Sequence, residues 1–307
     1  MIGDNLTRQQ ERDAASRAEW SSAHPEPVHG DGCARMPPKE RVEVKHRLSA
    51  DQYHAATDWL SNSMFKLFLE DPRLYEAAYI TKTLPHKRST AMDLGTVAHA
   101  AILEPHIIDG VCLEIPASAL NGDGHRKGSQ WKDFAEQNAG RILIKPEEMK
   151  LVRGMFEACY ANSKARRLLM APGATEASIF WTCTLSGVRR RVRPDKIVDG
   201  WGWVNLKTSS NGVDEDSFRR TVRNFGYDVG QEFYLDAADA LYGSRVPHVF
   251  ILVEQDPPHR VRLYELSEQW AERAGAIVDD GLRDFATRQA SGDWSNECEN
   301  VIQTLGV

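Results

Sequence analysis

The chain has 307 residues, of which 41% are hydrophobic and 27% charged, and its formal net charge is -6 at pH 7. This composition is typical of a globular protein and excludes collagen, a membrane bundle and a disulfide-rich miniprotein. No apolar stretch approaches the roughly 18 residues that a transmembrane helix needs, and the first residues lack the basic and apolar regions of a signal peptide. We therefore expect a cytoplasmic protein with no membrane partner.

The five cysteines are an odd number at wide spacings and form no Cys-x-x-Cys pair. This pattern argues against a disulfide framework and against a zinc or iron–sulfur site, so we expect reduced thiols. The negative net charge argues against a surface that is basic throughout. It does not exclude nucleic acid as a partner, because phosphate binding depends on local basic patches.

The first 46 residues are poor in aliphatic side chains and rich in Gln, Glu, Arg, Ser, Pro and Gly. Such a segment cannot bury enough apolar surface to offset the entropy lost on ordering. We predict a flexible N-terminal tail over residues 1–46, with a short helix near Thr7–Trp20. Residues 47–307 are of the right size for one domain with a sizeable core.

Apolar residues at helical spacing predict several helices in the first half of this domain. One runs from Ser61 to Phe68, ends at Asp71-Pro72 and resumes from Leu74 to Ala78. The pattern continues over Thr90–Leu103. Pro146, a favourable residue at the start of a helix, begins a longer helix that extends to about Met170.

Between Glu176 and Thr208 the hydrophobic period changes to two, which predicts strands. We expect them over Glu176–Cys183, Val188–Val198 and Trp201–Leu206, with a turn at Asp199-Gly200. The later elements are helices over Asp214–Val222 and Tyr227–Leu241, strands over His248–Glu254 and Arg260–Leu266, and a helix over Glu268–Gln289.

The turn centred on Gly200 determines which residues of this hairpin face each other. Facing residues in an antiparallel pair have a constant index sum, so Asp195 faces Asn205 with side chains about 5 Å apart, and Lys207 shares that face. With an acid at position 205, this is the P-D-x(n)-D-x-K arrangement of the PD-(D/E)xK nucleases. Taken alone the pattern is weak, because Asp and Lys on a hairpin most often form an exposed ion pair.

The chemistry behind this spacing is metal-assisted hydrolysis of a phosphodiester. Two carboxylates hold Mg²⁺, which polarises the phosphate and acidifies the attacking water. A lysine two residues after the second acid can orient or deprotonate that water, or stabilise charge on the phosphate. Two further residues are candidates for this site. His99 lies one helical turn after Gly95, although such a histidine is more often simply buried and hydrogen-bonded. Glu176 starts a strand, where a carboxylate is more often simply solvated.

These residues belong to a set of motifs that resembles the C-terminal nuclease domain of exodeoxyribonuclease VIII, the RecE type. The resemblance spans about Tyr53 to Trp294. The motifs are Tyr53-His54, Leu60-Ser61-Asn62-Ser63, Gly95-Thr96-Val97-Ala98-His99, Leu103-Glu104-Pro105, Glu176, Ile179-Phe180-Trp181, Arg193-Pro194-Asp195, Leu206-Lys207-Thr208 and Gln231-x-x-Tyr234. Several motifs in the right order are far more specific than any one of them.

The resemblance implies an α/β RecB-like nuclease fold, in which helices flank a central mixed sheet. It also implies a ring-shaped homo-oligomer that degrades linear double-stranded DNA from its ends, 5′ to 3′, with Mg²⁺ or alternatively Mn²⁺. The 3′ overhangs would pass to a single-strand annealing protein of the RecT type for recombination. The host would be a bacterium, or a phage within one.

The resemblance also implies roles for individual residues. His99 and Asp195, the position of Asn205 and the backbone carbonyl of Leu206 would hold the metal, and Lys207 would act on the water. Glu176 and Gln231 would help to place metal, water or phosphate, while Tyr234 would support the site.

Asn205 departs from the family pattern, which has an acidic residue at this position. Its neutral carbonyl oxygen removes one negative charge from a site that must hold a divalent cation, so metal affinity and rate should both fall. The change is either natural or introduced to trap substrate. Two other functions therefore stay open: a catalytically silent DNA-end-binding module, and a restriction-type endonuclease. A cluster-containing nuclease is disfavoured, because only Cys298 lies near the C-terminus.

Basic and hydroxyl side chains supply candidates for phosphate contacts. Each alone is more often part of a solvated surface, but beside a nuclease hairpin such groups are plausible contacts without sequence specificity. A helix N-terminus near Ser61 would suit a terminal phosphate, although Ser61 is also a natural N-cap. The candidates are Ser61, Ser63, Lys66, Arg126, Lys127, Arg189, Arg191 and Arg193.

Overall fold

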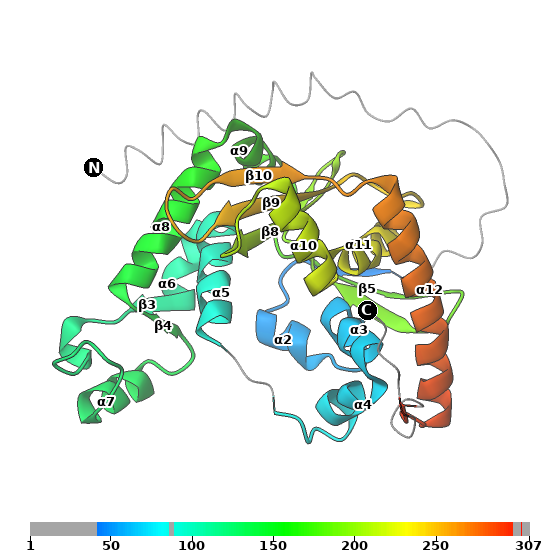
Figure 1. The fold of residues 1–307 in the computed structure, drawn as a ribbon, viewed down its shortest axis with the longest axis horizontal. Coiled ribbons are helices and arrows are strands. Elements are labelled where there is room, and N and C mark those ends of the chain that lie inside the picture. The colour runs from blue at the N-terminus through cyan, green and yellow to red at the C-terminus, as the bar shows by residue number, and fades with distance from the viewer. Residues whose placement is uncertain (1–41, 86–88, 297–301, 303–307) are drawn as a thin grey trace.

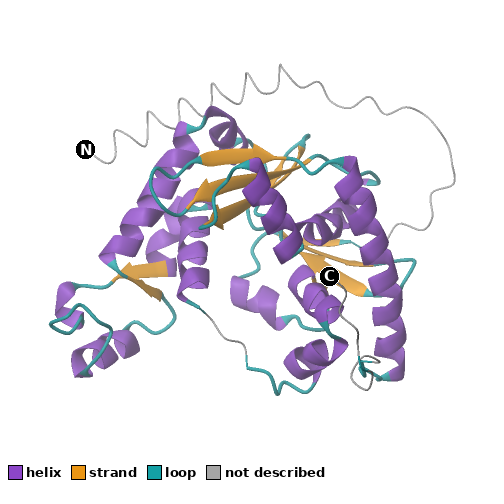
Figure 2. Cartoon of the chain, viewed as in Figure 1, coloured by secondary structure: helices purple, strands orange, loops and turns teal. Residues whose placement is uncertain are grey.

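The computed structural model describes residues 42–85, 89–296 and 302. Within these residues, helices surround two four-stranded sheets and a small two-stranded sheet (Figures 1 and 2). The α/β fold class expected from the sequence is confirmed, although the strands form two adjoining sheets and not one. No helix among the described residues has the length and apolar character needed to cross a membrane.

The elements follow the predicted order, with several short additions. The helices are α2 (Ala50–Ala55), α3 (Asn62–Glu70), α4 (Pro72–Tyr75), α5 (Thr90–Leu103), α6 (Ile108–Val111), α7 (Ser129–Gln137), α8 (Pro146–Ala161), α9 (Ser163–Met170), α10 (Glu215–Phe225), α11 (Tyr227–Tyr242) and α12 (Glu268–Ser291). A π-helix spans Glu76–Ile80, and 3₁₀ turns span Pro105–Ile107 and Ala117–Ala119. The strands are β1 (Glu43–Lys45), β2 (Leu60–Ser61), β3 (Cys112–Glu114), β4 (Ile142–Ile144), β5 (Ser178–Thr182), β6 (Arg189–Val192), β7 (Lys196–Val198), β8 (Gly202–Ser209), β9 (His248–Glu254) and β10 (Val261–Tyr264).

The first sheet has the order β1-β5-β6-β2, in which only the β2–β6 pair is parallel. Helices α3, α11 and α12 pack against it and share one apolar core with its strands. Phe65 and Phe233, whose ring centroids are 4.9 Å apart, lie in this core together with Trp181. The burial of these large side chains supplies most of the driving force for this half of the fold.

The second sheet has the order β10-β9-β8-β7, and its central β8–β9 pair is parallel. Strand alternation sends Val204 and Leu206 into a core with α5, α8 and α9, while Phe250 and Leu252 pack against α10 on the opposite face. Because both faces of the sheet are covered, β9 is buried along its whole length. Between His248 and Glu254 its residues are all apolar, as is typical of a strand covered on both faces. Figure 1 shows α5 and α10 on either side of these strands.

A seam of backbone contacts joins the two sheets. Thr175 and Lys196 form an antiparallel bridge, and the amide of Ile197 donates to the carbonyl of Ala174 at 2.7 Å. The amide of Glu176 donates to the carbonyl of Asp195 at 3.2 Å. The segment that leads into the first sheet therefore lies directly against the start of the second.

Two predicted elements are each divided in the structure. The strand expected over Val188–Val198 becomes β6 and β7, which lie in different sheets, because Pro194 cannot donate a hydrogen bond to a strand ladder. The helix expected over Pro146–Met170 becomes α8 and α9. Its break is at Asn162, whose side chain accepts hydrogen bonds from the amides of Lys164 and Ala165 and so caps α9.

Part of the segment that the sequence predicts to be a flexible tail is a strand in the structure. Residues 43–45 form β1, which pairs with β5 through Val44 and Ile179, so the boundary expected at residue 46 is wrong. Three residues are too few to give a clear strand pattern, and this pairing is visible only in three dimensions. The rest of the tail, with the helix expected near Thr7–Trp20, lies outside the described residues.

Arg190 is a charged side chain within the first core, where only 2% of its surface is exposed. Its guanidinium lies 4.8 Å from the ring centroid of Trp181 and 4.0 Å from that of Phe233. It also donates to the Asp236 carboxylate at 2.8 Å. Two aromatic faces and one carboxylate thus offset the cost of removing this cation from water.

We predict that Arg190→Ala lowers the free energy of unfolding by about 3 kcal/mol, because it leaves a cavity between two aromatic rings and removes the closer of the two ion pairs of Asp236. Arg189→Ala is the matched control. That side chain is 48% exposed in its ion pair with Asp58, so the change should cost about 1 kcal/mol or less. Urea denaturation measures both; equal losses would contradict a special role for Arg190.

Candidate active site

Asp195 is the centre of the candidate site. In the hairpin Lys196 faces Val204 and Val198 faces Gly202, which confirms the predicted index sum and brings Asp195 level with Asn205. The Asp195 Oδ2 atom accepts a hydrogen bond from the amide of Leu206 at 2.6 Å. It also lies 3.7 Å from the Lys207 Nζ atom. The carboxylate therefore continues the β7–β8 ladder in place of a backbone carbonyl and is held rigidly beside the lysine.

His99 reaches the same carboxylate from α5. Its Nδ1 atom lies 3.8 Å from Asp195 Oδ2, so the expected proximity of these two residues is confirmed. The helix lies close to β8 at this point, since a Cβ at Gly95 would stand at the ordinary contact distance of 3.8 Å from the Thr208 hydroxyl. Burial lowers the pKa of His99, only partly opposed by Asp195 and by a hydrogen bond with the Leu206 backbone. The imidazole is therefore neutral near pH 7, the form that binds metals.

Glu176 completes the group from the seam between the sheets. Its backbone has a left-handed φ of 53°, which is strained for a residue with a side chain and is typical of functional sites. Burial and the nearby charge of Asp195 raise its pKa to about 8. A cation at this point would remove the repulsion between the two carboxyl groups.

His99, Glu176 and Asp195 offer ligand atoms that all lie within 4.8 Å of one another. One imidazole and two carboxylates form an oxygen-rich donor set that suits Mg²⁺ or Mn²⁺ better than a thiophilic metal. The Leu206 carbonyl, to which Lys207 Nζ donates at 2.9 Å, is a further oxygen beside them. The residues present therefore fit a divalent cation.

Asn205 lies beside this group and is only 2% exposed. Its Oδ1 atom has no hydrogen-bond partner among the described residues. Such an orphaned buried oxygen is unusual, because it loses its hydration without compensation. A cation ligand would satisfy it, but a neutral amide contributes less to cation binding than the carboxylate of the family pattern.

Gln231 and Tyr234 lie one turn apart on α11, as predicted. The Tyr234 hydroxyl donates to the carbonyl of Arg193 at 3.4 Å and also bonds the Asn205 side chain, so it supports the Arg193-Pro194-Asp195 turn. Gln231 is buried, and its Oε1 atom has no partner among the described residues. Among the described residues it forms no hydrogen bond with Asp195, and its role stays a prediction.

Two residues near the site were missed by sequence reasoning. His248 is 6% exposed and stacks on Tyr234, with ring centroids 5.7 Å apart. Burial, together with the charge of Lys207, lowers its pKa to about 3. Tyr227 lies with its ring centroid 5.9 Å from Lys207 Nζ. Neither carries a sequence signal beyond an apolar strand and a helical stripe.

The hydroxyl and lysine candidates for DNA contacts gather at the start of α3. Ser61 is buried and accepts from the amide of Met64 at 3.3 Å, so it acts as the N-cap. Its hydroxyl also lies 3.1 Å from that of the exposed Ser63. Lys66 Nζ donates to the carbonyl of Phe225 at 2.8 Å. These contacts leave Ser63 and Lys66 as the better candidates for phosphate.

Most of the arginine candidates are engaged inside the protein. Arg191 is 2% exposed and lies against Tyr53 and Met64, which argues against the phosphate contact expected of it. Arg193 donates to the hydroxyl of Ser178 and to the carbonyl of Leu48. Sequence alone did not reveal this burial, because runs of arginine usually indicate a solvated surface.

The remaining basic candidates differ in their exposure. Arg126 pairs with Glu148 at 3.0 Å and donates to the carbonyl of Leu143. Lys127 is exposed, and so is about half of the Arg189 side chain. Lys127 and Arg189 therefore present cationic groups to solvent.

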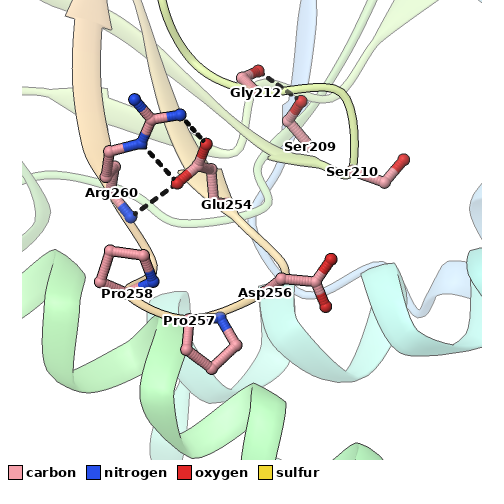
Figure 3. A pocket seen from close by; sticks show the side chains of 8 residues that line it. All are labelled: Ser209, Ser210, Gly212, Glu254, Asp256, Pro257, Pro258 and Arg260. Carbon is pink, nitrogen blue, oxygen red and sulfur yellow. Dashed lines mark hydrogen bonds and ion pairs between the residues drawn. The ribbon is translucent and has the colours of Figure 1, made fainter.

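A pocket of about 240 Å³ lies at the ends of β8 and β9, away from the candidate site (Figure 3). Glu254 and Arg260 lie side by side in its lining, with Arg260 Nε donating to Glu254 Oε2 at 2.8 Å. Because Glu254 and Arg260 neutralise each other, the pocket offers little uncompensated charge to a ligand. It lacks the convergence of ligand atoms seen at Asp195.

The seam, the hairpin and the histidine of α5 together place one imidazole, two carboxyl groups and a lysine in an arrangement that fits a divalent cation. The chain matches, over residues 61–303, the family model described as a PDDEXK-like domain of unknown function (DUF3799). It belongs to that family and thus to the PD-(D/E)xK nuclease superfamily.

A structural comparison supports the same fold. The chain is similar to a "Putative exonuclease" from Eubacterium rectale, with a TM-score of 0.58 and 15% sequence identity over 85% of this chain and 96% of that one. At this identity the likeness concerns the fold alone. Among curated proteins, none matches this chain.

The buried His248 predicts a dependence of stability on pH. Its pKa is about 3 in the folded protein and near 6.5 when unfolded, so between these values the unfolded state binds the extra proton. The contribution is fully present above pH 6.5 and falls as pH decreases, by at most about 1.4 kcal/mol per pH unit. His248→Leu should remove this component, whereas substitution of the exposed His106 with Gln should not.

Urea denaturation between pH 4.5 and 7.5 measures the three slopes. Comparison of each variant with the unmodified chain cancels the titration of other groups, including Glu176. An unchanged slope in His248→Leu would contradict the burial of a neutral imidazole.

Proposed function

We propose that the chain is a Mg²⁺-dependent exodeoxyribonuclease that degrades linear double-stranded DNA from its ends, 5′ to 3′, and that Asn205 impairs it. The observation that carries the proposal is the convergence of His99, Glu176 and Asp195 within 4.8 Å, with Lys207 at 3.7 Å from the Asp195 carboxylate. A structural ion pair alone requires neither the histidine nor the second carboxyl group.

His99, Glu176 and Asp195 would hold the metal, with the Asn205 side chain and the Leu206 carbonyl as additional oxygens. When bound, Mg²⁺ supplies positive charge that polarises the phosphate and favours ionisation of water. The rigid hydrogen bond from the Leu206 amide to Asp195 keeps the carboxylate in place, so little reorganisation is needed at the moment of reaction.

Lys207 supplies the mobile charge of the site. Its ammonium donates to the Leu206 carbonyl and can exchange this bond for one to a water molecule or a phosphate oxygen. There it orients the water that attacks phosphorus and stabilises the negative charge that develops on the phosphate. The pKa of Glu176, which burial and Asp195 raise to about 8 without a metal, would fall when a cation binds, so Glu176 would serve there as a carboxylate ligand.

The preference for DNA ends, the 5′-to-3′ direction, a ring-shaped oligomer and transfer of the overhang to a RecT-type annealing protein rest on the resemblance to RecE-type nucleases. The exposed cations Lys127 and Arg189 are suited to backbone contacts without base specificity. We place the reaction in DNA recombination for the same reason.

A second candidate function is a catalytically silent DNA-end-binding module, which Asn205 specifically favours. An endonuclease of the same fold would instead cut closed DNA. Incubation with linear and covalently closed circular duplexes separates the three: loss of the linear substrate alone supports the exonuclease, cleavage of circles the endonuclease, and binding without cleavage the silent module.

We predict that Asn205→Asp raises nuclease activity on linear duplexes on the order of tenfold or more and strengthens Mg²⁺ and Mn²⁺ binding. The added carboxylate restores one negative charge at an oxygen that is already buried and unpartnered. Gel assays of DNA degradation and calorimetric titration of the metal measure the two effects.

Asn205→Ser is the control for altered packing, because it changes the side chain without adding charge. The double variant Asn205→Asp with Lys207→Met should bind metal but lose the gained activity. Equal activity of the unmodified chain and Asn205→Asp would contradict the proposed role of position 205.

A further inference from the structure

An exposed aromatic ring lies at the junction of α10 and α11. Phe225, the last residue of α10, is 55% exposed. Gly226 adopts a left-handed φ of 57°, which turns the chain directly into α11. The turn brings Phe225 against Tyr227, with ring centroids 5.9 Å apart and an interplanar angle of 28°. One face of Phe225 is therefore supported by Tyr227 while much of the ring is open to solvent.

This pair of rings leads to the candidate active site. Tyr227 lies 5.9 Å from Lys207 Nζ and stacks on the buried Phe250 at 5.9 Å and 13°. Burial, and then the charge of Asp195, raises the pKa of Tyr227, which also indicates that its hydroxyl is near the carboxylate. Phe225 is thus separated from the reacting groups by a single ring that Phe250 holds in place.

A second cation accompanies the exposed ring. Lys66 Nζ donates to the carbonyl of Phe225, and Lys66 forms no ion pair with any described residue. Burial and then the charge of Lys207 lower the pKa of Lys66 to about 8, partly opposed by the charge of Asp228, so the ammonium groups of Lys66 and Lys207 lie near each other. Gly226 leaves room for the lysine, since a Cβ there would stand 3.1 Å from its Cδ atom.

We propose that Phe225 and Lys66 form a nucleotide subsite, in which the Phe225 ring stacks on an unpaired base at the DNA end and Lys66 binds the adjoining phosphate. The inference rests on the proposed function and specifies the substrate as an end whose terminal base leaves its pair. An aromatic face beside a cation matches the base and phosphate of one nucleotide. The lack of base-specific hydrogen-bonding groups on the ring makes the contact tolerant of sequence.

The position of Phe225, one ring away from Lys207, suits a role in holding the opened DNA strand. A base stacked on Phe225 keeps its strand beside Lys207 after the terminal pair has opened. The energy of stacking offsets part of the energy lost on unpairing. Ends that are frayed or carry an unpaired terminal nucleotide should therefore bind better than fully paired ends.

The test uses the unmodified chain and a linear duplex with 2-aminopurine as the terminal 5′ nucleotide, in EDTA so that no cleavage occurs. Stacking on Phe225 should change the fluorescence of the base on binding. Phe225→Ala should weaken binding about tenfold, the 1.4 kcal/mol level of the stacking contribution of one base, and abolish the fluorescence change. Phe225→Trp should retain both.

Tyr242→Ala is the matched control, because Tyr242 is 50% exposed and lies at the other end of α11, about 22 Å along the helix from Tyr227. It should leave binding and fluorescence unchanged. Thermal unfolding shows whether each variant is folded. If Phe225→Ala does not fold, Phe225→Trp still tests the subsite, because it should retain both binding and the fluorescence change.

The outcomes separate this inference from the proposed function. Tight binding with the same fluorescence change in the unmodified chain and in Phe225→Ala would overturn the stacking subsite and leave the nuclease proposal intact. If the unmodified chain neither binds duplex ends in EDTA nor degrades linear duplexes with Mg²⁺, the proposed function fails and the subsite with it, whereas degradation without such binding overturns the subsite alone. Loss of binding in Phe225→Ala with equal loss in Tyr242→Ala would show a general effect on the helix and would also overturn the subsite.

Discussion

The seam at which residues 174–176 pair with residues 195–197 is the constraint on which the site depends. These backbone hydrogen bonds join two sheets whose strands otherwise pair separately. They bring the carboxyl groups of Glu176 and Asp195 together although burial and like charge oppose it. The left-handed backbone of Glu176 shows that the arrangement is imposed by the fold at a local cost.

Charge balance explains why position 205 matters. With an acid there, three carboxyl groups would face His99 and Lys207, and a divalent cation would compensate them. With Asn205, the group has one negative charge fewer, while the buried amide oxygen stays without a partner. The remaining geometry is intact, because the Leu206 amide and Tyr234 hold the turn independently of the charge at this position.

The sequence predicted the parts of the site that follow from local periodicity. The Gly200 turn determined the register of Asp195 and Asn205, and the helix that carries His99 was predicted with its observed bounds. The division of the strand at Pro194 was missed, because apolar residues on both sides preserve the strand pattern. The proline was nevertheless a usable signal.

The arginines show what periodicity cannot reveal. Arg191 was predicted to contact phosphate, yet it and the neighbouring Arg190 both lie among aromatic side chains that come from distant parts of the chain. Their burial depends on tertiary contacts with Phe233 and Tyr53, which a strand pattern does not encode. The number of basic residues near a site is therefore a poor guide to the number of phosphate contacts.

With these arginines buried, Lys66 and Lys207 are the two neighbouring ammonium groups beside the candidate site, where Lys207 also lies 3.7 Å from Asp195. The charge of Lys207 adds to burial in lowering the pKa of Lys66, and burial together with the same charge lowers the pKa of the neighbouring His248. A phosphate placed near Lys66 and Lys207 would relieve this repulsion, so part of the electrostatic energy stored in the free protein is recovered on binding. A metal ion would thus compensate the negative charge of the carboxyl groups beside Lys207, and a phosphate would compensate the positive charge of the ammonium groups of Lys66 and Lys207.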